Sequence, residues 1–239
     1  MTFLIVIISL AIVYWTSLPL LIKRYDIIVE YIYFVQRFKI GSSLVKLVLT
    51  LATITLLTTV IYAILINVFH GVLGYLFALA VLTYCLGPLQ YSTQQSYELL
   101  ASDAITQTFA VLFWFLVLGP AGAVFYYVNS RIQQVEQDNE VLQAADYVEN
   151  LLNWIPVRIV GFCFALVGHF SSVINYWLKN LFNGLNDNHH FLIQCFELAY
   201  RVEPQVDQEV VLSKNQYMVS LIFRSLILWL VVLALLVIF

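Results

Sequence analysis

The chain has 239 residues, of which 62% are hydrophobic and only 10% are Asp, Glu, Lys or Arg, whereas soluble domains carry about 25% charged residues. This composition excludes a soluble domain and predicts a polytopic membrane protein. The formal net charge of -3, without a basic patch, gives no support for binding to nucleic acid.

Six apolar stretches follow one another along the chain and predict membrane segments. They are Thr2–Ile22, Leu47–Phe69, Val72–Leu86, Phe109–Val128, Trp154–Phe170 and Met218–Phe239. The first has no basic residues before it and no A-x-A site after it, which predicts an uncleaved helix. The stretch Trp154–Phe170 is short and holds a charge, so it either spans the membrane or is re-entrant. We therefore expect an all-α membrane helix bundle of about five or six membrane segments in a single domain, residues 1–239.

The basic residues predict the orientation of the bundle. If all six stretches span, one side of the membrane receives only Arg131. The other side receives Lys23, Arg24, Arg37, Lys39, Lys46, Lys179, Arg201 and Lys214. This bias predicts that loops 23–46 and 171–217 are cytoplasmic and that both termini lie outside.

Two amphipathic segments in the last predicted loop indicate helices that lie on the cytoplasmic surface of the membrane. Residues 173–185 place apolar side chains on one face, "NGLNDN" then interrupts the pattern, and Phe191–Tyr200 resumes it. The adjacent His189 and His190 cannot easily share one metal ion on a helix, so we expect solvated side chains. The three cysteines lack CxxC spacing, which predicts packed thiols; they are Cys85, Cys163 and Cys195.

A polar row leads into the fifth apolar stretch. Asp146, Glu149, Asn150 and Asn153 follow one another at i, i+3, i+4 and i+7 and so share one helix face. Polar groups that approach a membrane normally have partners, because an unpaired one is costly. The row is therefore a candidate binding surface as well as a candidate structural one.

Pro156 and Arg158 lie inside the apolar stretch that follows this row. With Asn153 as the N-cap, Pro156 falls in the first turn of a helix, where its missing N–H does no harm. A turn at Asn153 also lets Asp146 or Glu149 reach Arg158. In an unbroken helix, Asp146 and Arg158 are about 18 Å apart and cannot pair. Two alternatives stay open for Arg158: a structural ion pair, or a site for an anionic or polar headgroup.

The sequence "LGPAG", residues 118–122, breaks the fourth apolar stretch at Gly119, Pro120 and Gly122. It lacks the lysine of a phosphate-binding P-loop, and no G-x-G-x-x-G motif is present. The glycines either let another helix approach closely or aim the ends of half-helices at a ligand. Motifs such as H-E-x-x-H and G-x-S-x-G are absent, so no catalytic residue, metal ligand or cofactor is assigned, and the acids of residues 129–153 are expected to form a solvated face.

Three stretches together resemble the AmpE family of membrane proteins, which is distantly related to the cobinamide-phosphate synthases of the CobD/CbiB group. They are "VLFWFLVLGPAGAVFYYVN", "DYVENLLNWIPVRIVGFCFALVGHF" and "RVEPQVD". Asp146, Asn153, Trp154, Pro156 and Arg158 match the family signature D…(D/N)-W-x-P-x-R, and the break at residues 119–122 matches its glycine-rich centre.

This resemblance implies a multi-pass protein of the bacterial inner membrane that modulates β-lactamase induction in connection with peptidoglycan recycling. It also implies a functional link to the cytoplasmic amidase AmpD, besides contact with the lipid bilayer. The candidate ligand-binding residues are Asp146, Glu149, Asn150, Asn153, Arg158, Gly119, Pro120 and Gly122.

The chain departs from the pattern of the synthases at two informative places. "ASDAITQTFAV" replaces their E-N-x-S-D-G element, and Glu149-Asn150 replaces their Asp-Asp pair. A phosphate-and-metal site needs those charges, so the sequence does not favour an enzyme. A CobD/CbiB-like synthase stays an alternative, as does a membrane sensor or transporter for muropeptide-like or lipid ligands.

Overall fold

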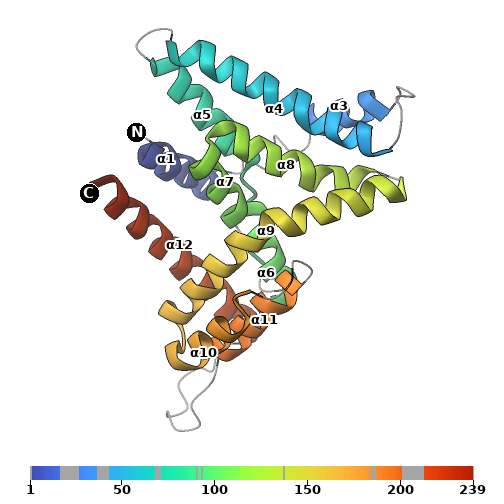
Figure 1. The fold of residues 1–239 in the computed structure, drawn as a ribbon. Helices are drawn as coiled ribbons and strands as arrows, with labels where there is room; N and C mark the ends of the chain where they lie inside the picture. Colours follow the sequence, from blue (N-terminus) through green and yellow to red (C-terminus); the bar gives the residue numbers. More distant parts are fainter. Residues whose placement is uncertain are drawn as a thin grey trace. The chain divides into compact units, whose positions relative to one another are not determined.

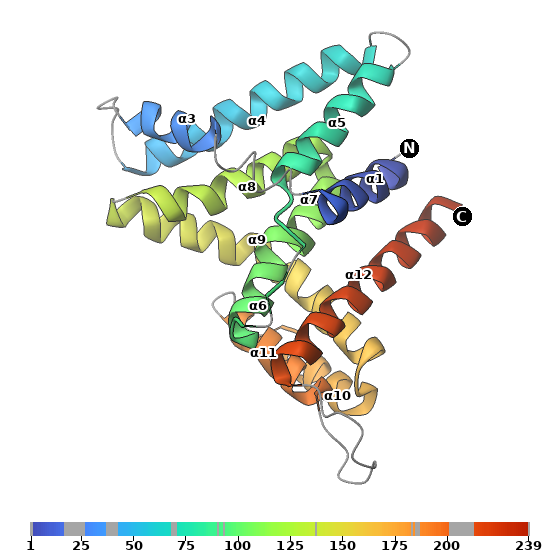
Figure 2. The same ribbon diagram turned by 180° about the vertical axis from the view of Figure 1, so that it is seen from behind.

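A computed structural model describes residues 2–16, 27–36, 43–67, 71–89, 91–92, 94–136, 138–182, 184, 187–200 and 213–238. Within these ranges the regular structure is entirely helical (Figures 1 and 2). The helices group into two compact units. Unit 1 comprises residues 1–89 and 110–152, and unit 2 comprises residues 90–109 and 153–239.

Unit 1 is built around the long helix α4. Its helices are α1 (Thr2–Trp15), α3 (Ile27–Gln36), α4 (Ser43–Asn67), α5 (Val72–Cys85), α7 (Ala110–Leu118), α8 (Pro120–Val135) and the first part of α9 (Asn139–Val167). Helix α4 packs against α5 and α8, α1 packs against α5, and α7 packs against α8. A Cβ atom on Gly74 would lie 2.9 Å from the backbone of Ile66, so this glycine permits the close contact of α5 with α4.

Unit 2 joins the region before α7 to the last third of the chain. It holds α6 (Tyr97–Ala104), the π-helical segment η2 (Ile105–Phe109), the rest of α9, α10 (Phe170–Asn180), α11 (Asn188–Ala199) and α12 (Lys214–Ile238). Helix α6 packs against α11 and α12, and α10 packs against α11. In the π-helical segment, the hydroxyl of Thr108 is 2.9 Å from that of Tyr91, and the rings of Phe109 and Trp229 are 5.9 Å apart.

Four helices of the described residues are long and apolar enough to cross a membrane. They cover Leu44–Asn67, Tyr97–Leu118, Asn139–Val167 and Lys214–Leu235. The apolar helices Thr2–Trp15 and Val72–Cys85 are shorter. These helices confirm the predicted all-α membrane helix bundle, and the chain is a multi-pass membrane protein.

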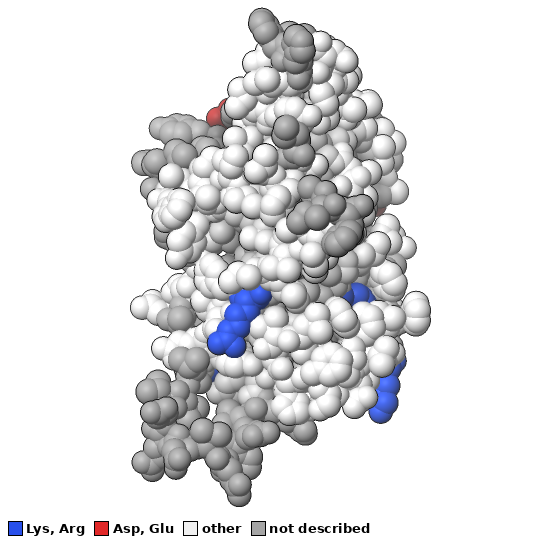
Figure 3. Space-filling model, turned by 90° about the vertical axis from the view of Figure 1, so that its left-hand side faces the viewer, with Lys and Arg blue, Asp and Glu red and all other residues white. Residues whose placement is uncertain are grey.

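Exposed apolar side chains follow the long helices, as expected of surfaces that face lipid. On α4, Leu56 is 63% exposed and Ile64 is 59% exposed, and Ile227 on α12 is 61% exposed. The face drawn in Figure 3 shows mainly uncharged residues, with only a few charged side chains. The threonines of α4 donate to carbonyls of their own helix, for example Thr58 Oγ1 to Ile54 at 2.8 Å, so they need no other partner.

One predicted membrane segment is wrong in its bounds. The stretch Phe109–Val128 is not a single helix, because the chain turns at Gly119 between α7 and α8. The candidate span that ends at this turn begins at Tyr97 instead.

The two predicted amphipathic helices are present as α10 and α11, and the three cysteines are buried and free, as expected. Five of the basic residues from which the orientation was predicted lie outside the described residues: Lys23, Arg24, Arg37, Lys39 and Arg201. The stretch "RVEPQVD" of the family resemblance also lies outside them. The orientation and the single domain therefore stay predictions.

Candidate functional site

Arg158 is a buried cation in a helix of membrane-spanning length. It lies on α9 and is only 4% exposed. Its Nη1 donates a hydrogen bond to Oδ1 of Asn188, and its Nε donates one to the carbonyl of Leu181 at 3.3 Å. Leu181 directly follows α10, and Asn188 is the first residue of α11, so the two acceptors lie at the two ends of the connection between these helices. The guanidinium therefore ties this connection to α9.

Aromatic rings cover the same guanidinium. Its central carbon lies 4.6 Å from the ring centroid of Phe191 and 5.1 Å from that of Trp154. A cation over an aromatic face gains about 0.5–2 kcal/mol, with the larger values where water is excluded. Asp187 adds a favourable electrostatic interaction with Arg158 from the start of α11. The surroundings thus offset much of the cost of holding a charge away from water.

Helix α9 approaches α10 and α11 closely at Gly161, one turn beyond Arg158. A Cβ atom at this position would lie 3.0 Å from the ring of Phe191, 3.3 Å from the sulfur of Cys195 and 3.4 Å from the ring of Trp177. The indole N–H of Trp177 also donates to the carbonyl of Arg158 at 2.7 Å. The α10–α11 pair is therefore fixed to α9 by packing, by the hydrogen bond from the Trp177 side chain to the backbone of α9, and by the contacts of Arg158.

The predicted turn at Asn153 is wrong, because α9 continues unbroken from Asn139 to Val167 with Pro156 inside it. Asn153 is therefore an interior helical residue, 8% exposed, and not an N-cap. Asp146 and Arg158 lie about 18 Å apart along this helix at 1.5 Å per residue, so the expected ion pair with Asp146 does not form.

Pro156 is accommodated by a side chain from another helix. Within α9, residue 156 would normally donate its N–H to the carbonyl of Leu152, four residues earlier, but proline has no N–H. The indole N–H of Trp114, on α7 of unit 1, donates to that carbonyl at 3.2 Å. The carbonyl that the proline leaves free thus has a donor, as a helix interior in a membrane requires.

The polar row before Pro156 makes its contacts within unit 1. Asn150 donates to Asp146 at 3.2 Å, and Glu149 accepts a hydrogen bond from Gln133 of α8. The amide of Gln133 also lies 3.2 Å from the carbonyl of Ala145. Part of the predicted row therefore joins α9 to α8.

Asn129, one turn before Gln133 on α8, is fully buried in the same helix contact. Its amide nitrogen donates to the carbonyl of Ala145 at 3.0 Å, and its Oδ1 has no hydrogen-bond partner among the residues that the structure describes.

The glycine break consists of a strained turn and a close helix contact. Gly119 has a φ of 68° and precedes α8, with Pro120 at the first helical position. A Cβ atom on Gly122 would lie 2.3 Å from the carbonyl oxygen of Trp114, which excludes any side chain without a shift of backbone. Residues 119–122 therefore let α8 fold back against α7.

The eight candidate ligand-binding residues thus fall into three groups. Asp146, Glu149 and Asn150 lie in the polar row of unit 1, Gly119, Pro120 and Gly122 form the α7–α8 turn, and Asn153 and Arg158 belong to unit 2. Whether these residues bind a ligand stays a prediction. Among the described residues, no group of three or more His, Cys, Asp or Glu side chains could hold a metal ion.

Sequence reasoning missed the partners of Arg158. Asn188 lies within "NGLNDN", which was interpreted only as a break between helices, yet its side chain is 4% exposed. A buried arginine requires hydrogen-bond acceptors. This requirement could have pointed to the polar residues of "NGLNDN" as its partners. The exposed His190 lies 3.6 Å from Asp187, consistent with the expected solvated histidine.

Comparisons with known proteins give a family match and several similar curated proteins. A family model described as "Regulatory signalling modulator protein AmpE" matches residues 105–239, which is more than half of the chain. "Protein AmpE" of Shigella flexneri is 28% identical over 109 residues, which cover 41% of this chain and 38% of that protein.

Two cobalamin proteins are also similar to the chain. "Cobalamin biosynthesis protein CobD" of Stutzerimonas stutzeri is 32% identical over 81 residues, covering 32% of this chain and 26% of that protein. The protein of the same name from Chromobacterium violaceum is 35% identical over 81 residues, covering 32% and 25%. The chain thus spans well under half the length of these curated relatives. No solved structure matches it.

Proposed function

The chain belongs to the AmpE family, and on that basis we propose that it modulates the induction of β-lactamase from the bacterial inner membrane, in connection with peptidoglycan recycling. The observation that carries this proposal is the family match over residues 105–239, which includes Arg158 and the helices that it holds. The name of the Shigella flexneri relative agrees with it. The cytoplasmic amidase AmpD is the proposed functional partner.

The α10–α11 pair is the part of unit 2 best suited to pass a signal. It is joined to a helix of membrane-spanning length through Arg158, Asn188 and Trp177. A displacement of α9 would therefore also displace α10 and α11, because breaking the hydrogen bonds of the buried guanidinium costs free energy. We propose that this connection forms the signalling element of unit 2. Ligand binding by Asp146, Glu149, Asn150, Asn153 and the turn at residues 119–122 stays a separate prediction.

The test is β-lactamase induction in the host bacterium after deletion of the gene. Cells are exposed to an inducing β-lactam, and β-lactamase activity is compared among the deletion strain, the strain complemented with the wild-type chain, and strains carrying Arg158→Ala or Ser171→Ala. Ser171 is an exposed residue of α10 and serves as the matched control. We expect altered induction in the deletion and Arg158→Ala strains and wild-type induction with Ser171→Ala, at equal membrane levels of each protein. Unchanged induction after deletion would contradict the role.

Cross-linking tests the partner. A photo-crosslinking residue in place of the exposed Lys179, on α10, is expected to capture AmpD if this helix pair faces the amidase. The same residue in place of Leu56 on α4, which is exposed on a lipid-facing surface, is the control position. Equal capture at both positions would argue against a specific contact.

A second candidate function is a synthase of the CobD type, favoured by the two cobalamin relatives at 32% and 35% identity. Growth on cobyric acid of a strain that lacks its own synthase tests it directly. Restored growth with this chain would establish the activity, and no growth at verified expression would exclude it.

A further inference from the structure

The starts of two candidate membrane spans in unit 2 lie beside α11. Lys214 is the first residue of α12, and its ammonium group is 3.5 Å from the carboxylate of Glu197 on α11. The same ammonium group lies 5.0 Å from the ring centroid of Tyr97, the first residue of α6. Both helices belong to candidate spans that begin at these residues. The end of α11 is therefore at the level of one membrane surface.

The end of the third span, α9, lies at the same level. A Cβ atom on Gly168, directly after α9, would lie 2.8 Å from the Cβ atom of Ala199, the last residue of α11. Helix α10 begins two residues later, at Phe170 (Figures 1 and 2). It has 11 residues, which is too short to cross a bilayer. Helix α10 thus starts at the membrane surface, where α9 ends.

One exposed edge of α10 is apolar and continues the outer surface of α9. Phe170 and Leu178 are exposed, and Phe182, two residues beyond the helix, is 85% exposed. On α9, Phe162 and Leu166 are also exposed, at intervals of four residues before Phe170. The outer surface of a membrane-spanning helix contacts acyl chains. The apolar edge of α10 is therefore continuous with a surface that faces lipid.

The other exposed edge of α10 is polar and carries little charge. Its residues are Ser171, Asn175 and Lys179, at intervals of four. Lys179 is the one charged residue of the helix. Electrostatic binding to anionic lipids requires clusters of Lys and Arg, whereas large apolar side chains bind by entering the boundary between headgroups and acyl chains. The composition of α10 favours the second mode.

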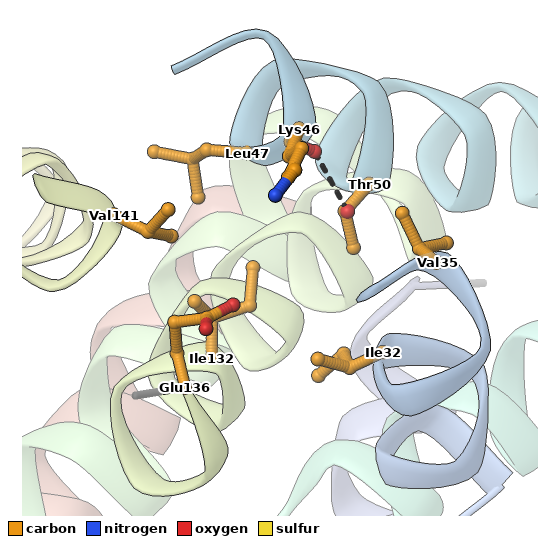
Figure 4. A pocket seen from close by; sticks show the side chains of 8 residues that line it. All are labelled: Ile32, Val35, Lys46, Leu47, Thr50, Ile132, Glu136 and Val141. Carbon is orange, nitrogen blue, oxygen red and sulfur yellow. Dashed lines mark hydrogen bonds between the residues drawn. The ribbon is translucent and has the colours of Figure 1, made fainter. Parts of the chain in front are cut away.

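The interior of unit 1 provides a contrast. The described residues of α3, α4, α8 and α9 leave a small opening lined by Lys46, Glu136 and apolar side chains (Figure 4). This opening has room for about one water molecule. A lipid cannot enter it, so the exposed edge of α10 is the stronger candidate for a functional contact with lipid.

We propose that the apolar edge of α10 inserts into the bilayer surface and responds to how tightly the lipids are packed. Phe170, Leu178 and Phe182 enter the boundary between headgroups and acyl chains, which loosely packed lipids leave more open. The indole of Trp177 ties α10 to the carbonyl of Arg158 on α9, so a change in insertion acts on a helix of membrane-spanning length. The inference does not depend on a role in β-lactamase induction, because it concerns the contact with lipid alone.

Spin-label accessibility in vesicles tests the insertion. Leu178→Cys and Phe182→Cys place a label on the apolar edge of the full chain, and Ser171→Cys and Asn175→Cys are the matched positions on the polar edge. The native cysteines are buried, and the wild-type chain, treated in the same way, measures their background labelling. In vesicles of unsaturated phosphatidylcholine, the ratio of oxygen collisions to collisions with a water-soluble nickel complex should be severalfold higher on the apolar edge.

Vesicles of different lipids separate packing from charge. Lipids with one saturated chain pack more tightly than lipids with two unsaturated chains, and they should lower the ratio at position 178. Phosphatidylglycerol adds negative charge at similar packing and should leave the ratio unchanged. A ratio that rises with phosphatidylglycerol and falls at high salt would overturn the packing assignment in favour of charge.

A second substitution tests the side chain that is most exposed. With the label at position 178, Phe182→Asn should lower the ratio, while Ser171→Ala is the control and should leave it unchanged. Frequent collisions with the nickel complex on both edges would overturn the insertion. Few collisions with either reagent on the apolar edge would also overturn it, because protein and not lipid would then cover this edge. Circular dichroism and size-exclusion profiles establish that each labelled variant is folded.

Discussion

The indole N–H of Trp114 donates a hydrogen bond to the carbonyl of Leu152, 3.2 Å away, and so supplies the donor that Pro156 lacks. The proline interrupts the hydrogen bonds of α9 without ending the helix. Because the compensating donor is a side chain of α7, the contribution of Trp114 to stability depends on the residue at position 156.

This dependence predicts strong coupling between the two positions. Trp114→Phe removes the donor, leaves the carbonyl of Leu152 unsatisfied, and should lower the free energy of unfolding by about 1–3 kcal/mol. In a Pro156→Ala background the alanine N–H bonds to the same carbonyl, so Trp114→Phe should cost less, with a coupling energy of about 1 kcal/mol. Denaturant titration of the four proteins in detergent measures the cycle. Equal cost in both backgrounds would mean that the indole hydrogen bond does not compensate for the proline.

The second prediction concerns the acceptor of Arg158. Asn188→Ala leaves a buried guanidinium without its side-chain acceptor and should lower the free energy of unfolding by about 2–3 kcal/mol, since hydrogen bonds to charged groups are the stronger ones. Asn188→Asp restores an acceptor and adds an opposite charge, so it should be clearly more stable than the alanine variant. Asn175→Ala, exposed on α10, is the control. An alanine variant at position 188 as stable as this control would show that Asn188 does not hold the arginine.

The sequence predicted the helices better than it predicted their contacts. Apolar stretches of membrane length predicted the membrane bundle, because hydropathy along a helix is a local property. They located α4 and α12, although α4 begins at Ser43 and not Leu47, and α12 begins at Lys214 and not Met218. The break at Asn153 was wrong for a non-local reason. An asparagine before a proline is typical of a helix start, whereas the donor for the carbonyl that Pro156 leaves free comes from Trp114, which is distant in sequence.

The partners of Arg158 show the same limit. The cost of a buried charge made partners necessary, and the nearest acids of the polar row were the natural choice. In the structure the hydrogen-bond acceptors are Asn188 and the carbonyl of Leu181, the rings of Phe191 and Trp154 cover the guanidinium, and the nearby acid is Asp187 at the start of α11 and not one of the polar row. Which acceptors reach the guanidinium depends on how α10 and α11 pack against α9, and no spacing within one segment encodes that arrangement.

Gly122 provides the third prediction. Alanine normally favours a helix over glycine by about 1 kcal/mol. Here its Cβ would lie 2.3 Å from the backbone oxygen of Trp114, so Gly122→Ala should lower the free energy of unfolding by about 1–3 kcal/mol. Gly184→Ala is the matched control, since a Cβ atom there meets nothing within 4 Å. Thermal unfolding in detergent compares the two, and similar values would show that α7 and α8 are not in close contact at this turn.

The last prediction concerns pH. Burial in α11 raises the pKa of the Cys195 thiol from 9.0 to about 12. The folded chain therefore keeps this proton up to about pH 12, while the unfolded chain releases it near pH 9. Above pH 9 the unfolded state binds fewer protons, so the free energy of unfolding should fall as the pH rises, by at most about 1.4 kcal/mol per pH unit from this group. Cys195→Ala removes this contribution and should show a shallower decline between pH 8 and 10.5. The pKa of Tyr176 is raised by burial and also by Cys195, so the same variant weakens the Tyr176 contribution in the same direction. Denaturant titrations across this range measure the difference, and parallel declines would show that the thiol is as accessible in the folded chain as in the unfolded one.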